Sequence, residues 1–278
     1  MAKIAAIQMN SGMDLNDNLK MAKKLLQEAA TRGARVAVLP ENFPLLGKGE
    51  DYKKIKNSIQ EMEGHGQLQD FLAATAQELK LWIIGGTIPL SSDTPEKSYA
   101  ACLVYNAQGE QIARYNKIHL FDVNLNAQES YKESDTIVAG NNIIVVDTPV
   151  GCIGLSVCYD IRFAELFREL FKKGAEILIV PAAFTVPTGK AHWEVLLRAR
   201  AIENFCYVVA AAQWGRHGQE RETYGDSMFI APFGEVITRL PSGNGVIIAD
   251  IDLESVYSAR QKIPVGEHQR IFTDKQNF

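Results

Sequence analysis

Apolar side chains in the N-terminal third of the chain follow strand-like and helix-like patterns in turn. Continuous apolar runs at residues 3–9, 34–41 and 81–88 predict buried strands. Between them, apolar residues recur three and four positions apart within segments 19–29 and 68–79, which predicts two amphipathic helices. This alternation of strand and helix is typical of a layered α/β fold.

The remainder of the chain predicts further strands, some of them paired as hairpins. Segments 99–118 and 142–157 each contain two strand-like runs around a short turn. Helical spacing returns at residues 163–171 and 193–201. Further strand-like runs lie at residues 176–183, 205–213, 227–234 and 245–251. Nine or more strands and about four helices predict an α/β protein with two mixed sheets packed face to face and helices on the outside.

Composition indicates a globular protein and narrows its possible partners. The 278 residues are 46% hydrophobic and 22% charged, close to globular averages, so we expect one domain over residues 1–278. The formal net charge is −4 and basic residues form only short pairs, so nucleic acid is a poor candidate partner. The chain opens without a signal-peptide pattern, and no window approaches the roughly 18 apolar residues of a membrane span. We therefore expect a cytoplasmic protein that binds neither nucleic acid nor membrane.

Four cysteines lie inside apolar, strand-like runs: Cys102, Cys152, Cys158 and Cys206. No C-x-x-C pair or Cys/His cluster with zinc spacing occurs, which argues against a disulfide framework and against a zinc site. We expect free thiols, of which Cys102, Cys152 and Cys206 pack as small core hydrophobes.

Three reactive side chains stand where predicted strands end. Glu41 follows the run VAVLP, Lys117 follows QIARYN, and Cys158 follows GCIGLSV. Ligands of α/β proteins bind beyond the carboxyl ends of strands, so we expect one sheet edge to bring these groups together. Purely structural roles stay open at this point, because a lone cysteine in an apolar strand is more often core and a lone glutamate or lysine is more often a surface charge.

A glutamate, a lysine and a cysteine together suit the hydrolysis of an amide. Lys117 and the start of the helix predicted near Phe163 are expected to lower the pKa of Cys158 and to favour its thiolate. The Lys117 ammonium or the backbone N–H of Tyr159 would stabilise the oxyanion that forms on attack at a carbonyl. Glu41 would donate a proton to the leaving amine and then activate water.

Polar residues near these three allow structural roles as well as functional ones. We expect Asp160 and Arg162 to form a local ion pair that shapes the turn after Cys158. His119 either lines the site or is a hydrogen-bonded structural histidine. No G-x-S-x-G motif occurs, which argues against a serine nucleophile.

Four motifs, in the expected order, resemble those of the nitrilase superfamily of carbon–nitrogen hydrolases. They are LPENF around Glu41, YNKIHLFD around Lys117, YKESDT around Glu133 and GLSVCYDIRFAELFREL around Cys158. The resemblance covers nearly the whole chain and implies a four-layer αββα sandwich, assembly as a homodimer or larger homo-oligomer, and a Glu–Lys–Cys triad that needs no metal or organic cofactor. It also implies that Glu133 positions Lys117 or substrate, the alternative being an exposed loop charge. We further expect residues from about 255 to 278 to form a C-terminal extension that packs on a partner subunit.

Within the superfamily, residues 188–227 resemble the Nit branch, and most of all its deaminated glutathione amidases. Those enzymes hydrolyse the amide of glutathione in which a keto group replaces the glutamyl amino group, and the related ω-amidases act on α-ketoglutaramate. On this resemblance, Arg216, His217 and Arg221 are candidates to bind substrate carboxylates, the alternative being a polar loop without that role.

The sequence departs from the branch pattern at three positions. Asp226 stands where histidine is expected, and Ala231 and Phe233 stand where the branch tends toward aspartate and tryptophan. The triad is unaffected, so we expect an amidase that acts on a small keto-acid amide through a thioester on Cys158, with water as the second substrate. The alternatives are an ω-amidase, an N-carbamoyl-amine amidohydrolase, and a catalytically silent scaffold of the same fold.

Overall fold

The fold is built on two mixed β-sheets. The computed structural model describes residues 2–126, 129–218 and 221–271. The first sheet has the order β17-β1-β2-β3-β5-β4, and β6, which is not part of this path, also pairs with β5. Its strands are β1 (Ala2–Gln8), β2 (Ala34–Val38), β3 (Trp82–Ile84), β4 (Ile88–Ser91), β5 (Ser98–Tyr105), β6 (Gln111–Asn116) and β17 (Gly245–Ile251). β1, β2 and β3 run parallel, whereas β17 and β5 join them in antiparallel fashion.

The second sheet has the order β16-β15-β12-β11-β10-β9. Its strands are β9 (Val145–Thr148), β10 (Gly151–Leu155), β11 (Ile177–Ala182), β12 (Tyr207–Ala212), β15 (Ser227–Ile230) and β16 (Val236–Leu240). The three central strands, β10, β11 and β12, are parallel, and the outer strands are antiparallel to their neighbours. Both sheets are therefore mixed, as the sequence predicts.

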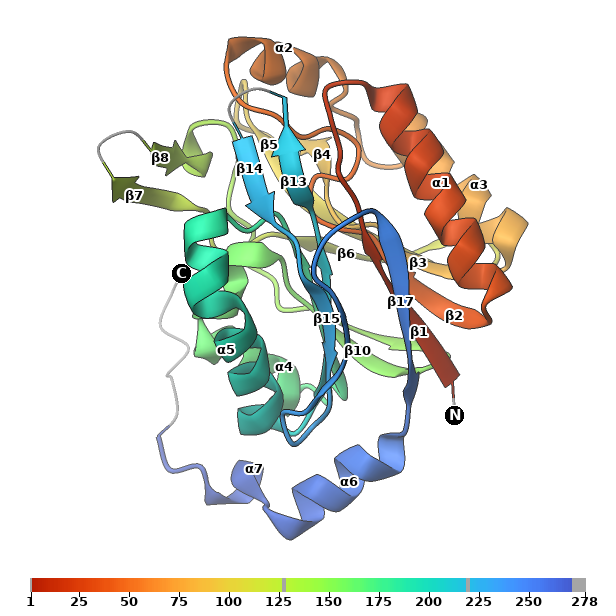
Figure 1. Ribbon diagram of the computed structural model, residues 1–278, viewed down its shortest axis with the longest axis vertical. Helices are drawn as coiled ribbons and strands as arrows, with labels where there is room; N and C mark the ends of the chain where they lie inside the picture. Colours follow the sequence, from red (N-terminus) through yellow and green to blue (C-terminus); the bar gives the residue numbers. More distant parts are fainter. Residues whose placement is uncertain (1, 127–128, 219–220, 272–278) are drawn as a thin grey trace.

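Helices cover the outer face of each sheet (Figure 1). α1 (Leu15–Thr31) and α3 (Gln67–Leu79) pack on the first sheet, and α4 (Ala164–Lys172) and α5 (Val186–Asn204) pack on the second. α1 begins where the Asp14 carboxylate accepts a hydrogen bond from the backbone N–H of Asp17, a common N-cap arrangement. The result is a four-layer αββα sandwich, which confirms the predicted fold.

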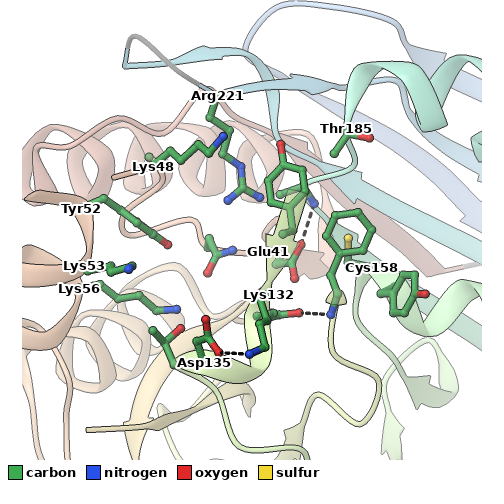
Figure 2. A pocket seen from close by; sticks show the side chains of 18 of the residues that line it. Glu41, Lys48, Tyr52, Lys53, Lys56, Lys132, Asp135, Cys158, Thr185 and Arg221 are labelled. Carbon is green, nitrogen blue, oxygen red and sulfur yellow. Dashed lines mark hydrogen bonds and ion pairs between the residues drawn. The ribbon is translucent and has the colours of Figure 1, made fainter. Parts of the chain in front are cut away.

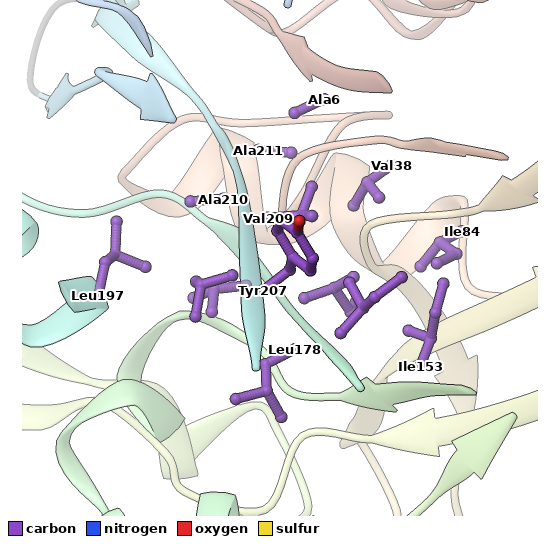
Figure 3. Packing of buried hydrophobic residues seen from close by; sticks show 14 of the residues in the cluster. Ala6, Val38, Ile84, Ile153, Leu178, Leu197, Tyr207, Val209, Ala210 and Ala211 are labelled. Carbon is purple, nitrogen blue, oxygen red and sulfur yellow. The ribbon is translucent and has the colours of Figure 1, made fainter. Parts of the chain in front are cut away.

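Alternate residues of the inner strands build the two apolar layers. Ile4 and Ala6 of β1 belong to the cluster between the sheets, whereas Ala5 and Ile7 belong to the cluster under α1 and α3. Figure 3 shows side chains of both sheets meeting in the inter-sheet layer. A strand buried on both faces needs apolar residues at successive positions, which explains why these strands read as continuous apolar runs.

Several short or exposed elements do not follow from the hydrophobic pattern. α2 (Glu50–Ser58) has no buried side chain. Two small hairpins also escape prediction: β7 (Asp122–Asn126) with β8 (Glu129–Lys132), and β13 (Trp214–His217) with β14 (Arg221–Tyr224). All three features lie at the same end of the sandwich in Figure 1. With little apolar surface to bury, they leave little periodic signal in the sequence.

The C-terminal part contains two further helices, α6 (Leu253–Lys262) and α7 (Val265–His268). The predicted extension of residues 255–278 thus begins inside α6, and its residues 272–278 lie outside the described residues. Its packing on a partner subunit stays a prediction. In the part of the chain that the structure describes, no helix has the length and apolar character needed to cross a membrane.

Candidate active site

Three loops that follow strands bring Glu41, Lys117 and Cys158 to one place. Glu41 lies three residues beyond β2, Lys117 follows β6 directly, and Cys158 opens a short 3₁₀ helix, η2 (Cys158–Arg162), after β10. All three side chains line the same cavity, although their exposed fractions are only 3%, 2% and 7%. The three groups meet at strand ends as predicted, but not at one sheet edge: β2 and β6 belong to the first sheet, whereas β10 belongs to the second.

Lys117 lies between two carboxylates. Its Nζ donates to Glu41 Oε1 at 2.8 Å and to the Glu133 carboxylate at 2.8 and 3.0 Å. Burial by itself would lower the pKa of Lys117, but the charges of Glu133 and Glu41 outweigh burial and raise this pKa well above its ordinary value. Lys117 is therefore a fixed ammonium ion at neutral pH.

Glu41 is an ionised carboxylate held by two donors. Its second oxygen, Oε2, accepts the backbone N–H of Ala183 at 2.9 Å. Burial works to raise the pKa of Glu41, yet the charge and hydrogen bond of Lys117 leave this pKa below its usual value of 4.5. A buried carboxylate that stays ionised next to a thiol is suited to accept the thiol proton.

Cys158 occupies a strained backbone position at the entrance of η2. Its φ angle is 49°, a left-handed conformation that is uncommon for residues other than glycine. The prediction of a lowered thiol pKa is wrong: burial, together with the Glu41 carboxylate, raises the pKa of Cys158 well above its usual value of 9.0, although Lys117 acts in the opposite direction. The resting pair is thus a protonated thiol beside an ionised carboxylate.

The other three cysteines are free thiols and are absent from the lining of this cavity. Burial raises the pKa of both Cys102 and Cys206 to about 12 and that of half-buried Cys152 to about 11. These residues match the predicted role of small packing residues, with Cys152 less fully buried than expected.

Asp160 fixes the turn that carries Cys158. Its buried carboxylate accepts the hydroxyl of Tyr115 at 2.6 Å and the backbone N–H groups of Val157 and His119 at 2.8 and 3.0 Å. His119 also contacts it through Nδ1 at 2.7 Å. Four contacts to one carboxylate tie η2 to the end of β6 and so place Cys158 beside Lys117.

The predicted ion pair between Asp160 and Arg162 is wrong. Asp160 is directed inward, where its contacts are those described above, whereas the Arg162 guanidinium lies 5.7 Å from the Tyr159 ring centre and 5.4 Å from that of Phe184. A buried carboxylate that already has several fixed donors gains little from a further cation.

Glu133 belongs to the same cluster as the triad. It starts a short 3₁₀ helix, η1 (Glu133–Asp135), and its Oε2 accepts the backbone N–H of Phe121 at 2.7 Å as well as Lys117 Nζ. Its side chain is 19% exposed, so the alternative of an exposed loop charge does not hold.

Glu41, Lys117 and Cys158 lie in a cavity of about 320 Å³ with a basic outer part (Figure 2). Its charged lining residues are Glu41, Lys48, Lys53, Lys56, Lys117, Lys132, Glu133, Asp135 and Arg221. The aromatic lining comes from Tyr52, Phe121, Tyr131, Tyr159 and Phe184. Sequence reasoning missed Lys48, Tyr52, Lys53 and Lys56, because the segment around α2 gives no strand-end or motif signal. Among the described residues, no group of three or more histidine, cysteine, aspartate or glutamate side chains is placed to hold a metal ion.

The predicted substrate-binding residues separate into two groups. Arg221, from β14, lines the cavity, and its binding of a substrate carboxylate stays a prediction. The other three candidates do not line it: His119 stacks on Phe163 with ring centres 3.6 Å apart, and Arg216 is exposed on β13. His217 is buried, and its nitrogens contact Ser11 and Thr223, so its role is structural.

The departures from the Nit pattern also lie away from the cavity lining. Asp226 forms an ion pair with Arg239, and its carbonyl oxygen accepts the indole N–H of Trp193 at 2.9 Å. Phe233 is 50% exposed, with its ring 5.5 Å from that of Phe205. An aspartate at position 226 is thus stabilised by a local cation and does not contribute to the cavity wall.

Comparison with known proteins agrees with this geometry. The carbon–nitrogen hydrolase family matches residues 3–261. The deaminated glutathione amidase of Yersinia enterocolitica is 40% identical over 97% of this chain and 93% of its own length, and that of Homo sapiens is 41% identical over 96% and 82%.

Solved structures show the same fold. The NitFhit protein of C. elegans superposes with a TM-score of 0.86 and 37% identity, covering 97% of this chain and 66% of the longer C. elegans chain. Saccharomyces cerevisiae Nit3, a member of branch 10 of the nitrilase superfamily, gives a TM-score of 0.84 and 29% identity over 95% of this chain and 94% of its own. The chain therefore belongs to the carbon–nitrogen hydrolase family.

Proposed function

We propose that this protein is a deaminated glutathione amidase. It would hydrolyse the amide that joins the keto-acid part of the substrate to cysteinylglycine, through a thioester on Cys158. The observation that carries the proposal is the buried contact network of Glu41, Lys117 and Glu133 beside a thiol, at the base of a cavity with a basic rim. About 40% identity to curated deaminated glutathione amidases supports the same substrate.

In the first half of the reaction, Glu41 acts as base and then as acid. It accepts the proton of the Cys158 thiol while the sulfur attacks the amide carbon, which gives a tetrahedral oxyanion. The protonated Glu41 then transfers this proton to the amide nitrogen. The C–N bond breaks, cysteinylglycine leaves as an amine, and the acyl group remains on Cys158 as a thioester.

In the second half, water replaces the amine. Glu41 takes a proton from water as the water oxygen attacks the thioester carbon, and a second tetrahedral oxyanion forms. The C–S bond then breaks and Glu41 returns the proton to the Cys158 sulfur, so the thiol is restored and the keto dicarboxylic acid is released. The same carboxyl group thus carries one proton in each direction.

Lys117 would stabilise both oxyanions, assisted by the backbone N–H of Tyr159. Its fixed positive charge costs no reorganisation at the moment of reaction, because Glu41 and Glu133 already hold the ammonium in place. Glu133 acts through Lys117 and is therefore a positioning residue. Arg221, on the cavity wall, would bind the carboxylate on the keto-acid side of the substrate.

An ω-amidase acting on α-ketoglutaramate is the second candidate, because Arg221 would serve its keto-acid carboxylate equally well. An N-carbamoyl-amine amidohydrolase is less favoured, since a cationic amine would meet Lys48, Lys53 and Lys56 in the outer part of the cavity. The non-enzymatic alternative is a catalytically silent scaffold protein of the same fold.

Product release from deaminated glutathione, α-ketoglutaramate and N-carbamoylputrescine separates these candidates. We expect the highest kcat/KM for deaminated glutathione and a loss of at least about a thousandfold in Cys158→Ala. Turnover undiminished in Cys158→Ala would exclude the thioester mechanism, and absence of turnover on all three substrates would favour the scaffold.

Two finer expectations are part of this proposal. We propose a homodimer or larger homo-oligomer, which light scattering after size-exclusion chromatography tests. We also propose a cytoplasmic location, which fractionation of the source cells tests.

A further inference from the structure

Three cations of the cavity lining have no carboxylate within ion-pair distance among the described residues. Lys48 and Arg221 lie 5.6 and 5.9 Å from the centre of one ring, that of Tyr131. Lys56 lies 5.9 Å from the Tyr52 ring. Aromatic faces stabilise cations but leave their charge uncompensated.

Other lysines of the same cavity are already paired. Lys53 donates to Glu50 at 2.9 Å, and Lys132 lies 3.1 Å from Asp135. Two like charges on one aromatic ring repel each other unless an anion lies between or beside them. The cavity lining therefore contains more positive charge than its own carboxylates neutralise, and Lys48 and Lys56 supply part of this excess on the side of α2.

The reaction fixes which part of a substrate reaches this region. The acyl group stays bound to Cys158 as a thioester, so it must occupy the inner cavity, whereas the amine must leave through the mouth. Cysteinylglycine extends about 7 Å beyond the cleaved nitrogen, at roughly 3.3–3.6 Å per residue, and ends in a carboxylate. Figure 2 shows Lys48 and Lys56 across the cavity from Cys158, on the side of α2.

We propose that Lys48 and Lys56 form a subsite for the terminal carboxylate of the leaving group, and so select peptide-like amides over simple carboxamides. This proposal rests on the proposed function, since it assigns the outer half of the same cavity. Arg221 would hold the carboxylate of the keto-acid part, and the α2 side would hold the second carboxylate. α-Ketoglutaramate, which releases ammonia, has no group that reaches the α2 side.

The test compares three substrates in Lys48→Gln/Lys56→Gln. The substrates are deaminated glutathione, its C-terminal carboxamide, which lacks the distal charge, and α-ketoglutaramate. We expect KM for deaminated glutathione to rise about tenfold with kcat unchanged, because two partly exposed ion pairs are lost. KM for the other two substrates should change less than about twofold in the variant. The KM of the wild type for the carboxamide should be as high as the KM of the variant for deaminated glutathione itself.

Lys54→Gln is the matched control. Lys54 is on α2, like Lys56, but it is highly exposed, lies 3.9 Å from Asp51 and is absent from the cavity lining. It removes one positive charge, half of the change in the double variant, without contact to the site, so its kinetic constants should equal those of the wild type. In the wild type, moreover, KM for deaminated glutathione should rise with salt concentration while KM for the carboxamide rises less.

Failure of the subsite and failure of the proposed function give different results. If the wild type hydrolyses deaminated glutathione and the double variant has the same KM, or if all three substrates are affected equally, the subsite is refuted and the amidase assignment stands. If the wild type does not hydrolyse deaminated glutathione, the proposed function is refuted and the subsite with it.

Discussion

Replacing Glu133 by glutamine tests whether the buried charge network supports catalysis. Glu133→Gln keeps the shape of the side chain but removes its charge. Lys117, with 2% of its side chain exposed, would lose two charged contacts at 2.8 and 3.0 Å and retain only Glu41 as a carboxylate partner. One oxygen would remain to accept the N–H of Phe121, so the change acts mainly on Lys117.

The expected cost follows from burial. Breaking a buried ion pair by removing one partner typically costs about 3–5 kcal/mol. Because Glu133 is 19% exposed and the amide oxygen still accepts a hydrogen bond, we expect a smaller decrease of about 2–3 kcal/mol in the free energy of unfolding. Lys117 would also shift toward Glu41, away from the position of the oxyanion. A displacement of this kind lowers kcat by about a hundredfold.

Urea unfolding and steady-state kinetics with deaminated glutathione measure the two effects. Glu78→Gln is the matched control, since Glu78 pairs with Lys23 at the same distance of 2.8 Å but with about half of each side chain exposed. An exposed pair contributes less than about 1 kcal/mol, and kcat should be unchanged in the control. As a further check, the pKa of Lys117 should fall in Glu133→Gln, because the largest charge that raises it is gone.

A Glu133→Gln variant with wild-type kcat would refute the reasoning that Glu133 positions Lys117. If stability and kcat fell equally in Glu133→Gln and Glu78→Gln, the burial argument would fail. A loss of stability without loss of kcat would show that the network is structural only.

Three further predictions concern titration and the turn that carries the thiol. The rate of alkylation of Cys158 by iodoacetamide should be nearly independent of pH from about 6 to 9, and it should be low in Glu41→Gln. The rate for Cys152, which has a pKa of about 11, should instead increase about tenfold for each unit by which the pH rises. Parallel pH profiles for the two thiols would contradict base assistance by Glu41. Burial lowers the pKa of His217 to about 4 in the folded chain, whereas in the unfolded chain it stays near 6.5. Between these two pH values the unfolded chain binds a proton that the folded chain does not bind, so the free energy of unfolding should decrease by up to about 3 kcal/mol as the pH falls toward 4. Urea titrations of wild type and His217→Gln check this, and equal slopes would disprove it. Asp160→Asn places an amide donor beside the backbone N–H groups that the carboxylate now accepts. It should lower the free energy of unfolding by about 2–3 kcal/mol and kcat by about tenfold or more. An unchanged urea midpoint and an unchanged kcat would argue against the anchoring role of Asp160.

The sequence by itself determined the layers of the fold and the position of three reactive groups. Strands buried on both faces require continuous apolar runs, and amphipathic helices require apolar residues at helical spacing, so both leave a local record. Ligands bind beyond strand ends for a topological reason, which identified Glu41, Lys117 and Cys158 as candidates, although the expected single sheet edge proved to be strand ends of two facing sheets.

The tertiary structure decided what those groups do to one another. Glu41 and Lys117 are 76 residues apart, and Glu41 and the N–H of Ala183 are 142 apart, so no local pattern records their contacts. The protonated state of the Cys158 thiol was predicted with the wrong sign, because burial by neighbours from several elements outweighs the charge of Lys117. Equally, α2 buries no side chain, and only the folded chain places its Lys53 and Lys56 along the cavity. Hydrophobic periodicity is a property of successive residues, whereas a pKa and a binding surface depend on groups that are distant in sequence and meet only after folding.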